Sequence, residues 1–220
     1  MGLQKSTFKF LADLANNNDR NWFSENRSAY DEARADVIQL AEEILISLKK
    51  VDFNIPAQLT GAKSVFRIYR DIRFSKDKSP YKTYMGIWVP AYLNQTSGPG
   101  YYLHLEPNAS FLGAGYWMPS SQDIKLIRQE IDYETELFKE LTGSISNLGF
   151  QFNFEESLKR APKDYNEEHQ LLEFLKLKSF EIRLSFSDIL LYDDDFVFTI
   201  VNQMASVVPY VSFLRKAIDS

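Results

Sequence analysis

The chain has 220 residues, of which 45% are hydrophobic and 15% aromatic, enough to fill one sizeable core, and we expect a single domain over residues 1–220. Its net charge of −5 opposes sequence-independent adhesion to nucleic acid or anionic lipid, so neither a nucleic-acid partner nor a membrane partner is expected. The absence of cysteine excludes disulfides, thiolate zinc sites and a thiolate nucleophile, and together with the lack of a long apolar run it favours the cytoplasm.

The first third of the chain is typical of helices. Residues 6–17 and 33–50 place apolar side chains at helical spacing, and the polar run at 16–20 ends the first of these helices. From residue 63 the pattern changes to β-branched and aromatic runs. Four strands in meander order are predicted, at 64–71, 83–91, 101–107 and 110–117.

The remaining elements alternate. Ser120 is a predicted N-cap for a helix with an isoleucine stripe, and helices are also expected at 134–141 and 167–176. Strands are expected at 148–154 and 180–185, and the last helical stretch, 194–218, should kink or break at Pro209. The predicted fold class is α+β, with a central, mostly antiparallel sheet of about four meander strands plus later strands, packed by N-terminal and C-terminal helices.

One segment of the chain concentrates positive charge. Residues 63–82 contain seven bases and two acids, a net charge of +5, which leaves −10 for the remaining residues. If 64–74 alternate as a strand, Arg70 points to the same side as the apolar Phe66 and Ile68. Because a guanidinium is not left unpaired in a core, Arg70 must contact a carboxylate or carbonyls, lie at the end of the sheet, or mark a bulge.

The charge excess predicts an anion site. Guanidinium groups bind carboxylate and phosphate with two parallel hydrogen bonds, and lysines add mobile point charges. We therefore expect a binding or regulatory domain that holds a small phosphorylated or carboxylated ligand in a cleft. The predicted ligand-binding residues are Arg67, Arg70, Arg73, Lys78, Tyr81 and Lys82.

Three other interpretations of the same residues stay open. The cluster fits a structural network in which Asp71 and Asp77 each neutralise two bases. It also fits an enzyme acting on an anionic substrate, with Asp71 or His104 as general acid or base and the arginines stabilising developing charge. A third interpretation is an interaction module that recognises an acidic partner protein.

Tyr102, His104 and Glu106 alternate along one predicted strand, so they should share a face of the sheet. This pattern can support general acid–base chemistry, and Glu106 joins Asp71 and His104 as a candidate catalytic residue. His104 and Glu106 supply only two metal ligands, so no metal site is predicted. Motifs for nucleotide phosphates are absent, no cofactor is expected, and the sequence leaves the oligomeric state open.

The segment RIYRDIRFSKDKSPYK at 67–82 resembles the RxxRDxRFxxDKxPYK signature of an uncharacterised, conserved hypothetical family of bacterial proteins and fungal regions, domain of unknown function 2461. The resemblance extends to NNNDRNWFSENRSAY, YYLHLEPNASFLGAGYWMP and LKRAPKDYNEEH, and so covers most of the chain. It implies family membership and no particular activity.

Overall fold

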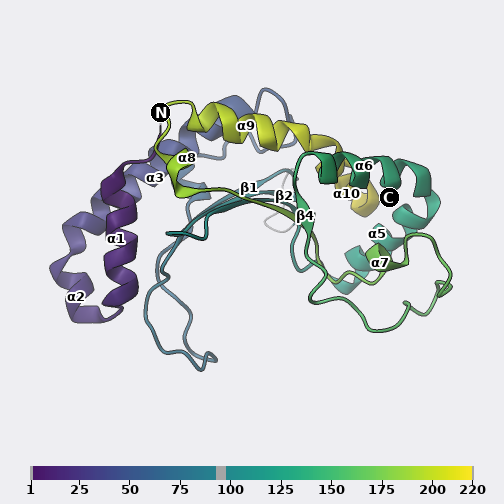
Figure 1. Cartoon of the computed structure of the whole chain (residues 1–220), viewed down its shortest axis with the longest axis horizontal. Coiled ribbons are helices and arrows are strands. Elements are labelled where there is room, and N and C mark those ends of the chain that lie inside the picture. The colour runs from purple at the N-terminus through teal and green to yellow at the C-terminus, as the bar shows by residue number, and fades with distance from the viewer. Residues whose placement is uncertain (1, 93–97, 220) are drawn as a thin grey trace.

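A computed structural model describes residues 2–92 and 98–219 and confirms an α+β fold built on one antiparallel sheet (Figure 1). The strands are β1 Met85–Pro90, β2 Gly100–Leu105, β3 Phe111–Tyr116, β4 Gln151–Phe152 and β5 Phe180–Ser185. They pair in the order β1-β2-β3-β5-β4, and every pair is antiparallel. β1, β2 and β3 are three of the four predicted meander strands, and β5 and β4 are the later strands.

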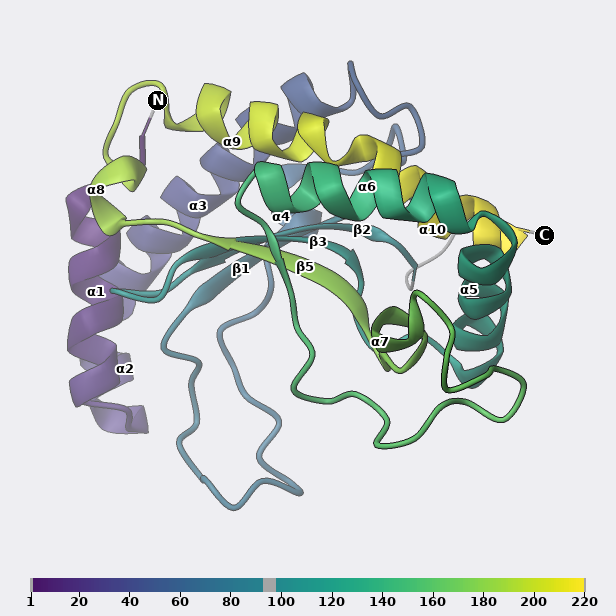
Figure 2. The same ribbon diagram turned by 45° about the vertical axis from the view of Figure 1, so that its right-hand side comes forward.

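Helices surround this sheet unevenly. Their bounds are α1 Lys5–Asn16, α2 Arg20–Glu25, α3 Arg27–Leu48, α4 Gly61–Ser64, α5 Ser121–Tyr133, α6 Thr135–Asn147, α7 Leu172–Leu175, α8 Asp188–Leu191, α9 Phe196–Ser206 and α10 Val208–Asp219. In Figures 1 and 2, α3, α9 and α10 cover one side of the sheet, α1 and α2 lie beyond one end, and α5 and α7 lie beyond the other. Among residues 2–92 and 98–219, no helix covers the opposite side of the sheet.

Strand alternation explains the two sides. Ile87, Val89 and Leu103 are fully buried on the helix-covered side. On the other side, Trp88 pairs with Tyr102 across β1 and β2, and both side chains are only partly buried. We call this second side the open face. Its positions along the strands are Trp88, Tyr102, His104, Phe111, Gly113, Glu181 and Arg183.

Several local predictions are confirmed in detail. The Ser120 side chain caps α5 by accepting the Asp123 N–H at 3.1 Å. The C-terminal stretch breaks into α9 and α10, bent by 46°, and Pro209 lies in the first turn of α10, where its missing N–H costs nothing. The predicted helix at 167–176 forms only over α7, and the strand at 148–154 only over β4.

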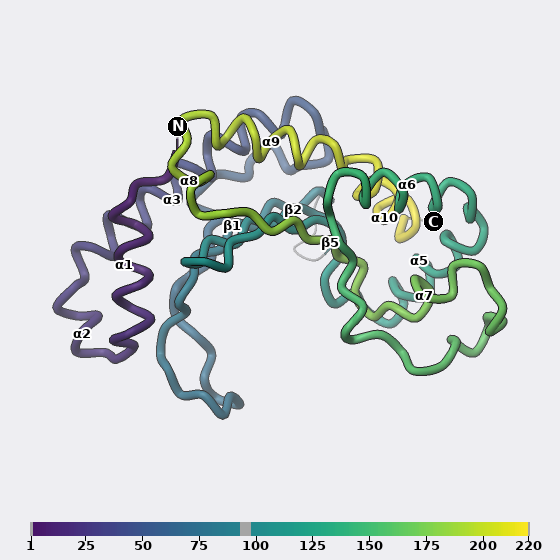
Figure 3. The backbone as a smooth tube through the Cα atoms, viewed as in Figure 1, coloured from purple at the N-terminus to yellow at the C-terminus, as the bar shows by residue number. Residues whose placement is uncertain are grey.

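The strand predicted at 64–71 is wrong. Ser64 is the last residue of α4, and the residues after it make two isolated bridges, Val65 to Ile87 and Tyr69 to Tyr81. Residues 65–84, which we call the arm, instead project away from the sheet as a closed loop (Figure 3). The alternating apolar residues end in water, where Phe74 is 95% exposed. Burying this many cations between a sheet and its helices would be costly, so the charged side chains of the segment stay outside the core, and only Val65, Ile68 and Tyr81 reach it.

No single described helix is long and apolar enough to span a membrane, although α9 and α10 together meet the criteria of length and composition as a bent pair.

Candidate functional site

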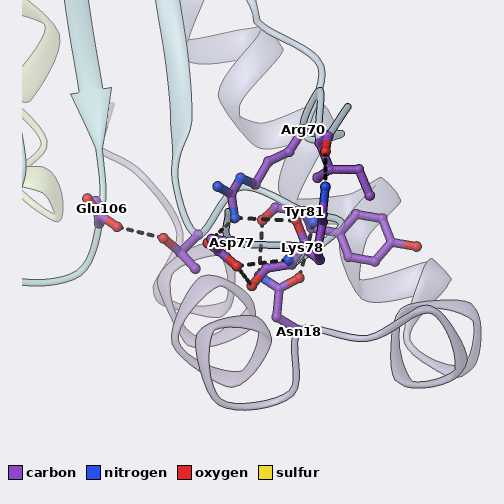
Figure 4. A network of polar contacts seen from close by, with 9 residues as sticks. Asn18, Arg70, Asp77, Lys78, Tyr81 and Glu106 are labelled. Carbon is purple, nitrogen blue, oxygen red and sulfur yellow. Dashed lines mark hydrogen bonds and ion pairs between the residues drawn. The ribbon is translucent and has the colours of Figure 1, made fainter. Parts of the chain in front are cut away.

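The arm is anchored at its second half by the turn that precedes α2. The Asn18 side-chain amide accepts the Tyr81 N–H at 3.1 Å and donates to the Tyr81 carbonyl at 3.0 Å, as a neighbouring strand would (Figure 4). The Tyr81 ring stacks on Phe23 of α2 with a centroid separation of 4.0 Å. Tyr81, a predicted ligand-binding residue, is therefore buried against the helices and holds the arm in place.

Arg70 is paired inside the arm, as the sequence argument required. Its guanidinium forms an ion pair with Asp77 and also donates to the Ser79 carbonyl at 3.3 Å. Hydrogen bonds from Ser79, followed by the bond from Arg70, hold the pKa of Asp77 well below its usual value. Lys78 donates to the Ile72 carbonyl at 2.9 Å and so closes the distal loop of the arm (Figure 4).

Arg73 is paired with the second acid of the cluster. Its Nη2 lies 2.6 Å from the Asp71 carboxylate, and both side chains are largely exposed. Hydrogen bonds from Arg73, with a further contribution from the charge of Arg67, lower the pKa of Asp71. Each acid of the cluster thus pairs with one base, and not with the two that a fully structural network would need.

Arg67 and Lys82 remain without an acid. No carboxylate in the described ranges 2–92 and 98–219 forms an ion pair with either residue, and the acids outside the cluster do not fold back onto it. Lys82 Nζ donates to the Arg67 carbonyl at 3.0 Å and lies 5.3 Å from the Phe66 ring centroid and 5.8 Å from that of Tyr84. Burial, and then the charge of Arg67, lower the pKa of Lys82. We call this part of the arm, with Phe66, Arg67, Lys82 and Tyr84, the arm root.

On the open face, the predicted alternation brings three polar side chains into one hydrogen-bonded chain. The Tyr102 hydroxyl lies 2.9 Å from His104 Nδ1, and His104 Nε2 lies 3.0 Å from Glu106 Oε2. The other Glu106 oxygen accepts the Thr83 hydroxyl at 2.7 Å, so the chain ends on the arm. Figure 4 shows Glu106 extending from the sheet toward the arm.

The pKa shifts of Tyr102 and His104 determine which atoms of this hydrogen-bonded chain carry protons. Burial lowers the pKa of His104 against the opposing effect of Glu106, so the imidazole is neutral at pH 7. With a carboxylate at Nε2, that nitrogen carries the proton, and Nδ1 accepts from Tyr102. Burial also raises the pKa of Tyr102, which keeps its hydroxyl protonated as the donor.

The arm root and the histidine are neighbours. The Tyr84 ring lies 4.3 Å from the His104 ring, and Phe66 lies 6.0 Å from Tyr102. Asp71, the other predicted proton carrier, is bonded to Arg73 within the arm and contacts no residue of this chain of hydrogen bonds. Tyr84 thus neighbours both Lys82 and His104, whereas Asp71 bonds to Arg73.

The described residues contain no group of three or more metal-ligating side chains. His169, the second histidine, bonds to Asp132 of α5 at 3.0 Å and lies outside both the arm and the open face.

Sequence reasoning misses Asn18, Tyr84 and Thr83 as parts of this region. Asn18 belongs to the polar run that ends α1, and nothing local distinguishes an amide that ends a helix from one that anchors a segment 63 residues away. Tyr84 and Thr83 could have been predicted from the sequence, because they directly follow Lys82 where the arm leads into β1.

A family model described as "Conserved hypothetical protein (DUF2461)" matches residues 6–213. The matched range includes the arm, the open face and the anchor at Asn18. No curated protein and no solved structure matches the chain.

Proposed function

Because this chain belongs to the DUF2461 family of conserved hypothetical proteins, whose description states no activity, we propose its function from geometry: it binds a small anionic ligand at the arm root. The observation that carries this proposal is the pair of neighbouring cations, Arg67 and Lys82, that has no carboxylate partner in the described part of the chain.

The charges of Arg67 and Lys82 act on one another, and an anion near both would relieve this repulsion. Lys82 is partly buried, and its pKa is lowered by that burial and by Arg67, so its charged form is under-stabilised. A phosphate or carboxylate would offset both effects at once and would gain charge-assisted hydrogen bonds from both side chains. The neighbouring rings of Phe66 and Tyr84 would shield these bonds from water.

The other cations of the cluster receive supporting roles in this proposal. Arg70 is partly exposed, and its charge acts on the Tyr84 hydroxyl, so it adds to the positive potential on the side of the open face. Arg73, Lys78 and Tyr81 shape the arm through the contacts described above. Because the rest of the chain carries −10, a small ligand is favoured over a nucleic acid, and we place this binding in the cytoplasm on the ground of the cysteine-free sequence.

Calorimetric titration with inorganic phosphate, pyrophosphate and citrate tests the proposal. Replacing Lys82→Met or Arg67→Gln should weaken binding by about tenfold or more, as expected for a lost charge-assisted bond. The matched control is Lys76→Gln, which removes one exposed charge from the same arm and should change affinity far less. Equal losses in all three variants would mean diffuse attraction, and unchanged binding in Lys82→Met would contradict the proposed site.

A second candidate function is supported by the hydrogen-bonded chain from Tyr102 to Glu106. In an enzyme, the Tyr102 oxygen would accept a proton from a ligand anchored at Lys82 while its own proton moved to His104 Nδ1, and Glu106 would stabilise the imidazolium. Phosphorylated and carboxylated metabolites incubated with the protein and followed by mass spectrometry would test this. Consumption that Tyr102→Phe abolishes, with anion binding retained, is the expected result; consumption unchanged by Tyr102→Phe, or none at all, would exclude it.

A further inference from the structure

A cavity lies on the open face where β3 ends and β5 begins. It has a volume of about 210 Å³. Its lining includes Trp117, Met118, Glu156, Lys178, Glu181 and Arg183. The strand register places Glu181 opposite Gly115 and Arg183 opposite Gly113, and these glycines leave space on the sheet surface for the two charged side chains.

Two large apolar side chains that line this cavity are exposed to solvent. Trp117 is 63% exposed and Met118 65% exposed. Met118 has a φ of 50°, in the left-handed region that a residue with a long side chain rarely adopts, and its N–H donates to Ser179 Oγ at 2.9 Å. Such a conformation is strained and persists where surrounding contacts enforce it. The turn thus holds a ring and a thioether at a cavity, although both would be better buried.

The charges at the cavity are balanced. Arg183 donates to Glu181 at 2.7 Å and lies over the Phe111 ring at 4.9 Å, while its buried Nε has no hydrogen-bond partner in the described residues. Lys178 and Glu156 are both exposed, and within residues 2–92 and 98–219 neither forms an ion pair. The lining therefore presents one unpaired cation, one unpaired carboxylate, and an unused donor of a guanidinium.

We propose that this cavity binds an α-amino acid with an apolar side chain, its carboxylate contacting Lys178 and Arg183 and its ammonium group contacting Glu156 and Glu181. A zwitterion matches a lining of balanced charge, whereas a simple anion or cation would leave one lining charge without a partner. The apolar side chain of the ligand would cover Trp117 and Met118. This site is separate from the arm root and does not depend on its function.

Three compounds that share one ring and differ only in charge provide the test. These are L-phenylalanine, 2-phenylethylamine, which lacks the carboxylate, and 3-phenylpropionate, which lacks the ammonium group. After a screen of the apolar amino acids by calorimetry, L-phenylalanine is expected to bind at least about tenfold more tightly than either derivative, since each lacks one charge-assisted contact. Trp117 fluorescence should shift to the blue on binding, because the exposed indole becomes covered.

Substitutions locate the site. Lys178→Gln and Glu156→Gln change exposed side chains, should preserve folding, and should each lower the affinity by about tenfold. The control variant Lys125→Gln, an exposed cation on α5, should bind as the wild type does. The proposal is overturned if no apolar amino acid binds at millimolar concentration, if either derivative binds as tightly, or if Lys178→Gln has no effect. Phosphate binding at Lys82 is measured separately, so either site can fail without the other.

Discussion

His104 is held at both ring nitrogens and on both ring faces. Tyr102 and Glu106 bond to the nitrogens, and the ring lies between Tyr84 at 4.3 Å and Phe111 at 4.7 Å. This arrangement fixes a single neutral tautomer, and protonation would break the bond that Nδ1 accepts. In its neutral form the ring therefore has one tautomer and one orientation, with Nδ1 facing the Tyr102 hydroxyl.

This geometry predicts that stability falls on mild acidification. The pKa of His104 is lower in the folded protein than the value of about 6.5 in the unfolded chain, so the unfolded chain binds more protons between the two values. The stabilising contribution is complete above pH 6.5 and is lost as the pH falls toward the folded-state pKa. Urea unfolding of the wild type between pH 8 and 5 should show this loss. A His104→Gln variant should show a smaller loss, and equal pH dependence in both proteins would contradict the assignment.

Lys82 gives a second prediction at this scale. Its lowered pKa means that folding disfavours its charge, so Lys82→Met should unfold with a free energy equal to or higher than that of the wild type at pH 7. The loss of the bond to the Arg67 carbonyl works against this gain. In chemical denaturation, phosphate should stabilise the wild type and leave the variant unchanged. A variant clearly less stable than the wild type would mean that Lys82 serves the scaffold.

At the scale of elements, the arm shows how a charged segment is held in place while only a few of its apolar side chains join the core. Its own pairing consists of a few backbone bonds, such as Arg70 N–H to Pro80 and Lys82 N–H to Ile68. The anchor at Asn18 supplies the bonds to Tyr81 that a neighbouring strand would otherwise make.

We therefore expect Asn18→Ala to free the arm. Two hydrogen bonds to a partly buried backbone are lost, which should cost about 1–3 kcal/mol of unfolding free energy. Amide hydrogen exchange should show faster exchange at Tyr81. The control is Asn16→Ala, which removes one exposed bond to the Ala12 carbonyl within α1 and should cost less than about 1 kcal/mol. Equal effects of the two changes would argue against the anchor.

Two glycines in different elements give opposite predictions. Gly115 in β3 has a φ of 111°, and a Cβ there would lie 2.1 Å from the Phe180 carbonyl oxygen, so Gly115→Ala should be strongly destabilising. Gly143 lies inside α6 with open space around it, so Gly143→Ala should stabilise by about 0.5–1 kcal/mol. Thermal unfolding of the pair checks both signs, and a stabilising Gly115→Ala would contradict the close approach.

The elements also show what the sequence can and cannot predict. Tyr102, His104 and Glu106 are correctly placed together because alternation along one strand is a local property. Alternation wrongly predicts a strand from Phe66 onward, because the same two-residue repeat of apolar side chains occurs in an exposed arm. Only the cost of burying the cations between them distinguishes the two structures. The cavity at Trp117 has no local signature, since its lining joins three segments, at 117–118, 153–156 and 178–183, that are distant from one another in the sequence.

At the scale of the whole molecule, the two faces of the sheet use polar groups differently. On the open face, Tyr102, Glu181 and Arg183 are partly buried and His104 is buried, and their polar groups bond to one another along the sheet surface. On the helix-covered side, Asp52 is 2% exposed, accepts the Tyr101 hydroxyl at 2.8 Å and lies 3.4 Å from Arg215 Nη1. Arg215 also donates to the Ala91 carbonyl at 2.7 Å. This cluster connects the segment after α3, the sheet and α10, and so stabilises the packing of the helices on the covered side of the sheet.

A double-mutant cycle on this cluster tests whether it acts as a unit. Arg215→Met leaves the Asp52 carboxylate buried without its cation and should cost about 3–5 kcal/mol of unfolding free energy. Asp52→Asn keeps an acceptor for Tyr101 and should cost less. In the double variant no uncompensated carboxylate remains, so its loss should fall short of the sum of the single losses by about 1 kcal/mol or more. Additive losses in urea unfolding would instead mean that Asp52 and Arg215 stabilise the fold independently, each through its own bonds to Tyr101 and Ala91.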